Sequence, residues 1–360
     1  MTWFIKASTH LHFGNDLVNS SFWHTYYNLS PMVSLVPIGS GHIHRTYKLQ
    51  TASEAFVAQQ LNTSVFKSPD LIVRNLKEAK RFIHKHDPEY LFVTPIPNVR
   101  GEWITLDEDG NHWRLFPFLK GTRTIDIVEN PTQAYQAAKA FGQLTRQLHG
   151  CDVSLFQETI PRFHHLTYRF QQFNDALQIA STDRLKQSEF AIRQAKEFSI
   201  LISVYEKSIA SGLPLRITHN DTKINNVLFD SSLTQVSAPI DLDTLMPGYF
   251  FYDLGDMVRT YTSPVSEEEK DLTKIGFRQE FHRAVMDGYL SEMERLLTPA
   301  EKTLIPFAGK MMTYIMALRF LTDFLQGDTY YHTTYPGQNL IRATNQLHFL
   351  HCLNTDPSGL

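Results

Sequence analysis

The sequence predicts an α+β fold of two lobes, in which a β-rich lobe precedes a mainly helical one. Three observations support this prediction: most of the elements expected in residues 1–119 are strands, apolar residues recur at helical spacing from Pro131 onward, and a strand-like island at 216–241 interrupts the helices. At about 150 residues per domain, a chain of 360 residues is long enough for two domains. Because segregated strands and helices form separate layers, we assign residues 1–119 to the first lobe and residues 120–360 to the second.

The composition excludes several classes of protein. Apolar residues make up 42% of the chain and charged residues 20%, which fits a globular protein and not a disordered chain, a collagen or a coiled coil. The 34 basic residues are balanced by 37 acidic ones. Because nucleic acids and anionic membranes are bound by clustered lysines and arginines, this balance predicts neither a nucleic-acid nor a membrane partner. The oligomeric state stays open.

Cysteine usage and the apolar segments predict a cytoplasmic protein. Cys151 and Cys352 are too few for a disulfide scaffold or a cysteine-rich zinc module, and they fit a reducing compartment. No apolar run follows a basic start at the N-terminus, which argues against a secretory signal. The most apolar stretch, Ile305–Leu325, contains three charged residues and is therefore expected to be a buried helix and not a membrane span.

The first lobe is expected to hold several strands and one helix. Val33–Ile38 and Ile43–Gln50 flank the run Gly-Ser-Gly, which is typical of a tight hairpin loop. Apolar residues at helical spacing predict a helix at Asn75–His86. The remaining expected strands are Phe56–Leu61, Leu91–Pro97, Glu102–Leu106 and His112–Leu119.

The second lobe begins with a helix that is marked at both ends. Asn130 is a suitable N-cap, Pro131 suits the first turn, apolar side chains share one face of Ala134–His149, and Gly150 ends the helix. The further expected helices are Ser188–Ser211, Lys270–Glu294, Pro299–Gln326 and Asn339–Leu353.

The island between these helices carries the densest polar cluster of the chain. Residues 218–226 read THNDTKINN, and a second strand ends in Asp241-Leu-Asp243. A hairpin between the two strands would return Asp241 close to Asp221. Carboxylate and amide oxygens suit Mg²⁺, and a separate aspartate can accept the proton of an attacking hydroxyl. Phosphoryl transfer needs these parts and a cation, for which Lys223 is the candidate; a plain Asn- and Asp-rich turn is the alternative.

The pattern His219-Asn-Asp221-x-Lys223-x-x-Asn226 resembles the catalytic loop of aminoglycoside phosphotransferases and choline-kinase-like enzymes, and more distantly that of protein kinases. The stretches THNDTKINNVLFD and PIDLDTLMPGYFFYDLGDMVR are similar to those of N-acetylhexosamine 1-kinases, as are GSGHIHRTY, FVAQQLNTSVFKSPD and ALRFLTDFLQGDTYY. The resemblance spans about residues 33–331. It implies a bilobal protein-kinase-like fold.

The resemblance also implies roles for the polar residues of the island. Asp221 matches the catalytic base, and Asn226 and Asp241 match the ligands of Mg²⁺. Asp243 either reaches the same metal or caps the next turn. Asp253 matches the helix aspartate that fixes the backbone of the catalytic loop in such kinases.

The first lobe is expected to bind ATP. The Gly-Ser-Gly run lies where a nucleotide-covering loop belongs, because glycine lets backbone amides approach phosphates; a plain hairpin turn would have the same sequence. The stretch Trp113–Leu119 matches the linker between lobes, whose backbone would bind the purine, and adenine and guanine remain alternatives. The expected nucleotide-binding residues are Gly39, Ser40, Gly41, Gln59, Pro117, Phe118 and Leu119.

One position departs from the usual kinase pattern. Gln59 stands on the third strand where kinases usually carry a lysine that holds the phosphates. Either Lys67, Arg74 or Arg45 supplies the missing charge, or nucleotide binding depends on Mg²⁺ and backbone amides. The departure also leaves a non-catalytic relative as an alternative.

Candidate acceptor-binding residues lie in both lobes. The resemblance to sugar 1-kinases implies that Arg319 donates to sugar hydroxyls, although Arg319 and Asp323 could equally form a surface pair one helical turn apart. Asp256 is a candidate ligand of a sugar hydroxyl, and its alternative is a pair with Arg259. His42, beside the glycine loop, is a further candidate.

These observations together predict a small-molecule kinase that uses ATP and Mg²⁺. The expected acceptor is a sugar hydroxyl, most specifically the anomeric 1-hydroxyl of an N-acetylhexosamine, with Asp221 contacting both the hydroxyl and its proton. One alternative is an aminoglycoside, choline or another amino alcohol as acceptor. The second alternative is a nucleotide-binding pseudokinase without catalytic activity.

Overall fold

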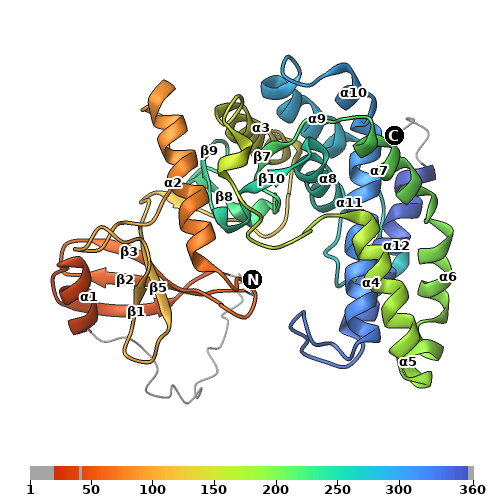
Figure 1. The fold of residues 1–360 in the computed structure, drawn as a ribbon, viewed down its shortest axis with the longest axis horizontal. Helices are drawn as coiled ribbons and strands as arrows, with labels where there is room; N and C mark the ends of the chain where they lie inside the picture. The colour runs from red at the N-terminus through yellow and green to blue at the C-terminus, as the bar shows by residue number, and fades with distance from the viewer. Residues whose placement is uncertain (1–19, 40–42, 356–360) are drawn as a thin grey trace, which may run out of the picture. The chain divides into compact units, whose positions relative to one another are not determined.

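The computed structural model describes residues 20–39 and 43–355 (Figure 1). Contacts between residues divide the chain into two compact units. The first contains residues 1–62 and 95–118, and the second contains residues 63–94 and 119–360. Residues 63–94 thus pack with the helical part of the chain, although they precede the last strands of the first unit. The functional division at residues 119 and 120 stays a prediction.

The first unit is built on an antiparallel sheet of five strands in the order β1-β2-β3-β5-β4. The short helix α1 (Ser20–Tyr27) accompanies the sheet. The strands are β1 (Met32–Pro37), β2 (Arg45–Thr51), β3 (Ala55–Gln60), β4 (Thr105–Leu106) and β5 (His112–Pro117). All their pairings are antiparallel. The antiparallel pairing of β1 with β2 is the one that the expected hairpin requires.

Side chains alternate between the two faces of this sheet, as strand geometry requires. One face carries Ala58, Trp113 and Leu115, which form a core with Trp23 of α1. The opposite face carries Gln59, which lies directly across from Arg114 in the register of β3 and β5. A polar pair therefore occupies the middle of the face that α1 does not cover.

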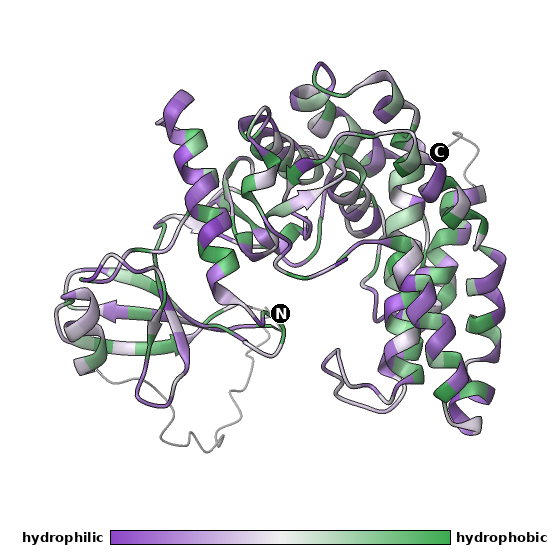
Figure 2. Cartoon of the chain, in the orientation of Figure 1, coloured by the Kyte–Doolittle hydropathy of each residue, from purple (hydrophilic) through white to green (hydrophobic). Residues whose placement is uncertain are grey.

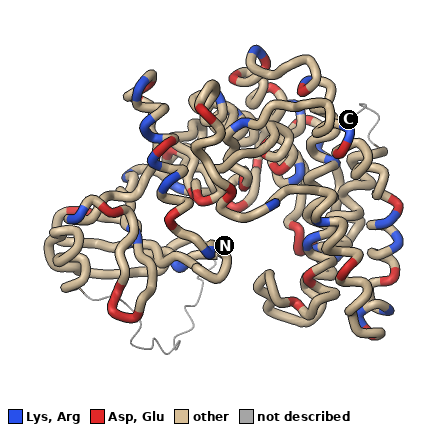
Figure 3. The backbone as a smooth tube through the Cα atoms, in the orientation of Figure 1, with Lys and Arg blue, Asp and Glu red and all other residues tan. Residues whose placement is uncertain are grey.

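Helix α2 (Pro69–His86) belongs to the second unit and is amphipathic. Its apolar face is buried, and Figure 3 shows lysine and arginine spread along the helix. The exposed basic residues are Arg74, Lys77, Lys80, Arg81 and Lys85. On the buried face, the amide nitrogen of Asn75 donates to the carbonyl oxygens of Leu245 at 2.9 Å and Gln157 at 2.7 Å. These bonds attach α2 to the segment that follows Asp243.

Helices form most of the second unit. Their bounds are α3 (Pro131–Gln147), α4 (Leu166–Ile179), α5 (Thr182–Gln187), α6 (Glu189–Glu197), α7 (Ile200–Ala210), α8 (Phe250–Tyr261), α9 (Gln279–Met293), α10 (Pro299–Thr303), α11 (Ile305–Leu325) and α12 (Gln338–Thr355). The N-cap of α3 is Asn130, as expected, because its side chain accepts a hydrogen bond from the backbone of Gln133.

Helix α11 is the centre of this unit, with α4, α8 and α12 packed around it (Figure 1). It is buried along most of its length and carries long apolar stretches (Figure 2), which confirms the expected buried helix. Within the described part of the chain, no helix combines the length and the apolarity that crossing a membrane requires.

Helices α8 and α11 cross at very short range. A Cβ atom added to Gly255 of α8 would lie 2.3 Å from the carbonyl oxygen of Ala308 on α11. Glycine is therefore the residue that lets the two backbones approach this closely.

Short strands carry the polar island. β7 (Arg216–Thr218) pairs with β10 (Met246–Gly248), and β8 (Val227–Asp230) pairs with β9 (Val236–Pro239) and with β6 (Thr122–Arg123). All three pairings are antiparallel. The expected hairpin between the two strands of the island is therefore present as β8 and β9.

One expected strand is absent. Residues 91–97 form only an isolated bridge between Ile96 and Leu115. The reason is the pair of prolines at 95 and 97, because proline has no backbone N–H to donate to a neighbouring strand.

Four predicted helices are wrong in extent. Helix α2 begins at Pro69, before the expected start at Asn75, because proline suits the first turn of a helix. Residues 270–278 stay outside α9 because the side chain of Asp271 accepts the backbone N–H of Thr273 and forms a local turn. The stretch 299–326 divides into α10 and α11 because Pro306 lacks the N–H that would continue one helix, and it suits the first turn of the next. The stretch 188–211 divides into α6 and α7 at a tight turn.

Candidate active site

A loop between β7 and β8 carries the candidate catalytic residues, and Asp253 of α8 holds its backbone. The two carboxylate oxygens of Asp253 accept the backbone N–H groups of His219 at 2.9 Å and Asn220 at 2.7 Å. Asp253 is fully buried. The role that the resemblance implied for Asp253 is therefore confirmed. Because Asn220 has a φ of +65°, the loop turns sharply here and relies on such bonds.

The imidazole of His219 fixes the loop from within. Its Nε2 lies 2.9 Å from the carbonyl oxygen of Ile240, and its Nδ1 lies 3.2 Å from the backbone nitrogen of Asp221. A carbonyl accepts and an N–H donates, so Nε2 carries the proton and Nδ1 accepts. A neutral histidine satisfies both contacts and joins the catalytic loop to the end of β9.

His164 supports the same loop from the segment before α4. Its Nε2 donates to the carbonyl oxygen of Asn220 at 2.7 Å. Burial lowers the pKa of His164 to about 3, so the ring is neutral at physiological pH. This role of His164 was not among the expectations from the sequence. The adjacent pair His164-His165 is visible in the sequence, but nothing local connects it with a loop some 55 residues away in the chain.

Asp221 lies at the tip of the loop with its carboxylate partly exposed. Its Oδ1 is 3.5 Å from the Nζ of Lys223. Burial opposes ionisation of Asp221, but Lys223 and the other basic groups around it together outweigh burial, so the pKa of the carboxyl lies below its ordinary value. Asp221 in turn raises the pKa of Lys223. At neutral pH the site therefore presents a carboxylate that can accept a hydrogen bond and an ammonium beside it.

Asn226 lies beside Asp221. Its side-chain amide nitrogen donates to the backbone carbonyl of Asp221 at 2.9 Å, and its backbone carbonyl accepts the N–H of Ile240 at 2.8 Å. Because the amide nitrogen is engaged, the side-chain oxygen is the atom that can bind a cation. The bond to Ile240 places the backbone of Asn226 next to the residue that precedes Asp241.

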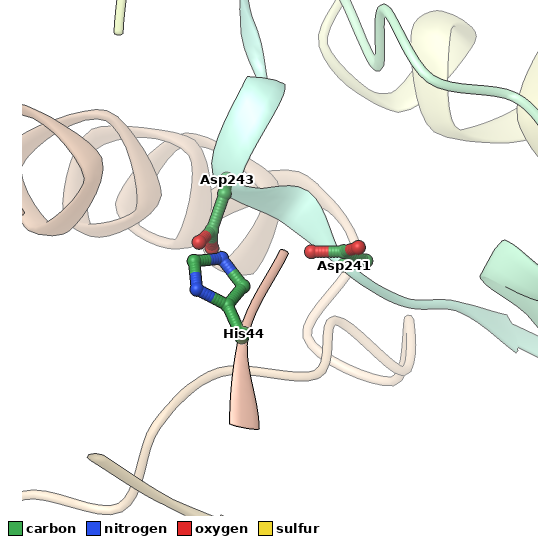
Figure 4. Close-up of side chains that lie close together, drawn as sticks. All are labelled: His44, Asp241 and Asp243. Atoms are coloured by element: carbon green, nitrogen blue, oxygen red, sulfur yellow. The ribbon is translucent and has the colours of Figure 1, made fainter. Parts of the chain in front are cut away.

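Asp241 and Asp243 follow β9 (Figure 4). Their carboxylate oxygens approach one another within 4.8 Å. Asp241 has a φ of +57° and precedes a turn of 3-10 helix without capping it through its side chain. Asp243 lies inside that turn and is buried. Two carboxylates and an amide oxygen form a hard-oxygen donor set, which suits Mg²⁺. The residues therefore fit the expected metal.

Gln59 is held by an arginine that the sequence analysis did not select. The side-chain oxygen of Gln59 accepts Nε of Arg114 at 2.8 Å, and its amide nitrogen donates to Thr46 at 2.9 Å. Neither Lys67 nor Arg74 belongs to this sheet. The alternation of strand β5 puts Arg114 on the same face as Gln59, but finding it requires the register of β3 with β5, which the sequence alone does not supply.

The other expected nucleotide-binding residues lie after β1 and at the end of β5, where the first unit meets the second in the chain. Gly39 has a φ of +82° after β1, which fits a tight turn that favours glycine. Pro117 ends β5, Phe118 closes the first unit, and Leu119 opens the second. The expected positions Ser40, Gly41 and His42 lie outside the described residues.

Asp256 forms the pair with Arg259 that the sequence offered as an alternative. Oδ1 of Asp256 accepts Nε of Arg259 at 3.0 Å and Nη2 at 2.8 Å, and Glu267 binds the remaining terminal nitrogen of Arg259 at 2.9 Å. Oδ2 of Asp256 is buried without a partner among the described residues. The role of Asp256 as a sugar ligand stays a prediction.

Arg319 lines a cavity of about 80 Å³ between α4, α11 and the segment after α11. Its guanidinium lies 4.7 Å from the ring centre of Phe163. The ring of Phe163 lies 4.2 Å from that of His164, which binds the catalytic loop. In the described part of the chain Arg319 forms no ion pair with Asp323, so the expected alternative of a surface pair is wrong. Instead, Asp323 accepts backbone N–H groups of the following segment.

Known structures share this fold. An aminoglycoside phosphotransferase from Alicyclobacillus acidocaldarius matches with a TM-score of 0.64 at 12% identity, over 97% of this chain and 98% of that one. Spectinomycin phosphotransferase in complex with ADP and spectinomycin matches with a TM-score of 0.57 at 13% identity, over 93% and 97%. A choline kinase from Streptococcus pneumoniae matches with a TM-score of 0.54 at 13% identity, over 92% and 97%. These likenesses confirm the protein-kinase-like α+β fold.

The family is shown by the sequence itself. The model of the phosphotransferase enzyme family, abbreviated APH, matches residues 34–289, which is more than half of the chain. This range contains the loop after β7, the hairpin that follows it and helix α8. The chain therefore belongs to the APH phosphotransferase family.

Proposed function

We propose that this phosphotransferase transfers the γ-phosphate of ATP to a sugar hydroxyl, and specifically to the anomeric hydroxyl of an N-acetylhexosamine. The observation that carries the kinase chemistry is the loop in which hydrogen bonds join Asn226 to the backbone of Asp221 and to the end of β9 before Asp241. The sugar acceptor is supported by the resemblance of the catalytic loop, of the segment that follows it and of α11 to sugar 1-kinases.

Asp221 is the proposed base. Its carboxylate stays ionised because Lys223 lowers its pKa, so it can accept a hydrogen bond from the acceptor hydroxyl and take up the proton as the new bond to phosphorus forms. Lys223 is placed to balance negative charge beside it. Asn226 and Asp241, with Asp243, would hold Mg²⁺, which when bound neutralises charge on the phosphates. Asp253 and His164 keep the loop in place.

ATP is the proposed donor. The backbone of Gly39, Ser40 and Gly41 would cover the phosphates, and the backbone of Pro117–Leu119 would bind the purine. Gln59 cannot supply the charge of the usual lysine. Arg114 is the cation that contacts Gln59, and we propose that Arg114 serves the phosphates in its place.

We expect Arg114→Met to raise the KM for ATP at least about tenfold while kcat changes little. A hydrogen bond to a charged group contributes about 1.5–3 kcal/mol, and 1.4 kcal/mol corresponds to a factor of ten. Steady-state kinetics at saturating acceptor would measure the effect, with melting curves to confirm that the variant is folded. Arg45→Met is the matched control, because Arg45 is an exposed arginine of the same sheet and a candidate from the sequence. An unchanged KM in Arg114→Met, or a large effect in Arg45→Met, would reject the assignment.

The cavity beside Arg319 is the proposed acceptor site. It connects with the catalytic loop through Phe163 and His164, and it is walled by aromatic rings. Sugars need directed hydrogen bonds and an apolar or aromatic wall, and this cavity offers both. Asp256 and His42 are the further proposed contacts.

The test is an acceptor panel. The purified protein with ATP and Mg²⁺ is offered N-acetylglucosamine, N-acetylgalactosamine, choline and kanamycin, and acceptor-dependent ADP release is measured. We expect turnover with the N-acetylhexosamines, and phosphorus NMR should place the product phosphate on the anomeric oxygen. Turnover with choline or kanamycin alone would favour an amino-alcohol kinase. ATP binding without ADP release for any acceptor would favour a pseudokinase.

A further inference from the structure

The cavity between α4 and α11 is lined by two arginines, Arg169 and Arg319, and by one carboxylate, Asp323. Arg319 lies within 5.8 Å of the ring centres of Tyr330 and Tyr331, as well as near Phe163, and among the described residues its polar contact is the sulfur of Met316 at 3.5 Å. No oxygen of the described residues accepts a hydrogen bond from this guanidinium. The positive charge of Arg319 is therefore held by aromatic faces and not by a carboxylate.

Arg169 of α4 adds a second positive charge to the same cavity. Its Nε and Nη2 donate to the carbonyl oxygen of Phe163 at 3.0 Å and 2.8 Å, and its Nη1 donates to the side chain of Gln172 at 2.7 Å. Both acceptors are neutral. Burial, together with the nearby charge of Arg319, lowers the pKa of Arg169 to about 10, which still leaves the group charged at neutral pH.

The carboxylate in the wall of the cavity is already occupied. Asp323 accepts the backbone N–H groups of residues 329, 330 and 331 at 2.8–2.9 Å, and the amide nitrogen of Asn339 at 2.8 Å. A carboxylate has about four sites that accept hydrogen bonds. Asp323 therefore holds the backbone of the segment that carries Tyr330 and Tyr331, and it has no acceptor site left for a ligand ammonium.

Two buried hydroxyl groups in the cavity lack partners. Thr322 Oγ1 and the hydroxyl of Tyr331 are buried and form no hydrogen bond with any described residue. Burial raises the pKa of Tyr331 to about 12, so its hydroxyl keeps its proton. Buried polar groups are nearly always hydrogen-bonded, so orphaned ones that line a cavity indicate a polar ligand.

We propose that this cavity selects acceptors by charge: it takes an uncharged, oxygen-rich acceptor and rejects a cationic one, with Arg169 and Arg319 as the specificity-determining residues. The proposal rests on the proposed function, because it makes the cavity the acceptor site of the kinase. Hydroxyl and amide oxygens would accept from Arg319 and pair with Thr322 and Tyr331. An ammonium would lose its hydration, meet two guanidinium groups and find no free carboxylate.

Pairs of acceptors that differ in charge test the proposal. N-acetylglucosamine is compared with glucosamine, N-acetylgalactosamine with galactosamine, and 3,3-dimethylbutan-1-ol with choline, whose shape it shares. We expect the neutral member of each pair to have a kcat/KM at least about tenfold higher, equivalent to 1.4 kcal/mol. Binding of the same pairs, measured by calorimetry with a non-hydrolysable ATP analogue, gives a readout that needs no turnover.

A variant of Arg169 tests the origin of the selectivity. Arg169→Met removes the charge and keeps an unbranched chain, and it is expected to reduce the preference for the neutral sugars at least about threefold. Arg193→Met is the matched control, because Arg193 is exposed on α6 and stacks on Phe190, away from the cavity. Its preference should equal that of the unaltered protein. If Arg169→Met does not fold, the pairs measured on the unaltered protein decide the question.

The outcomes separate this proposal from the proposed function. Equal kcat/KM for the neutral and cationic sugars would overturn the charge selection while leaving a sugar kinase in place. Tighter binding of neutral members without turnover of any sugar would support the selection and reject the sugar 1-kinase. Preference for the cationic members, or no measurable binding of any member, would overturn the proposal.

Discussion

Replacing Asp221 with asparagine is expected to lower kcat by about 10²–10⁴-fold, the usual contribution of a positioned general base. Asparagine keeps the size of the side chain, but its amide cannot take up the proton of the acceptor hydroxyl. The backbone of the loop does not depend on this carboxylate, because Asp253, His219 and His164 hold it through other atoms. The loss should therefore appear in turnover and not in folding.

Turnover with saturating ATP and acceptor measures the effect of Asp221→Asn. The affinity for a non-hydrolysable ATP analogue and the melting temperature should change little. Asp175→Asn is a suitable control, because Asp175 is an exposed aspartate of α4 that bonds Gln171. If Asp221→Asn retains more than a tenth of the original kcat, the assignment of Asp221 as the base is wrong.

The second large effect concerns stability. Glu301 of α10 binds Arg216 of β7 through two contacts, Nε to Oε1 at 2.7 Å and Nη2 to Oε2 at 2.8 Å. The side chains are only 1% and 8% exposed. Removal of one partner leaves a buried charge without compensation, which typically costs about 3–5 kcal/mol. We expect Glu301→Gln to lower the free energy of unfolding by about this amount, since glutamine preserves the volume and removes the charge.

Denaturant unfolding of the unaltered protein and of Glu301→Gln would measure the difference in the free energy of unfolding. The control is Glu78→Gln, which breaks the pair of Glu78 with Arg81 on α2. That pair has the same 2.7 Å distance, but Arg81 is 69% exposed and Glu78 30%. Exposed pairs contribute about 1 kcal/mol or less. Equal losses in the two variants would show that burial does not govern the strength of the Glu301 pair.

Much of the fold could be predicted because its signals are local. The apolar periodicity of α3 and α11, the Asn130 cap and the positive φ of Gly39 after β1 depend on residues within one or two turns of each other. The candidate catalytic loop could be selected for the same reason, since Asp221, Lys223 and Asn226 lie within a few positions in the chain. The hairpin that brings Asp241 back follows from the two short apolar strands.

The supporting residues could not be predicted because their partners are distant in the chain. His164 binds the carbonyl of Asn220, and Arg114 binds Gln59 only because β3 and β5 pair in one particular register. Asp323 looked like the partner of Arg319 at helical spacing, yet the segment after α11 folds back and takes its carboxylate. Such contacts are decided by tertiary packing, which outweighs local spacing.

The close crossing of α8 and α11 has a consequence for how this protein can evolve. Gly255 lies two positions after Asp253 on the same helix, so any side chain there would lever α8 away from α11 and displace the carboxylate that holds the loop. A side chain at position 255 is therefore expected to lower turnover as well as stability. Substitution at this buried crossing would then be limited by the position of the candidate catalytic loop as well as by the packing of the two helices.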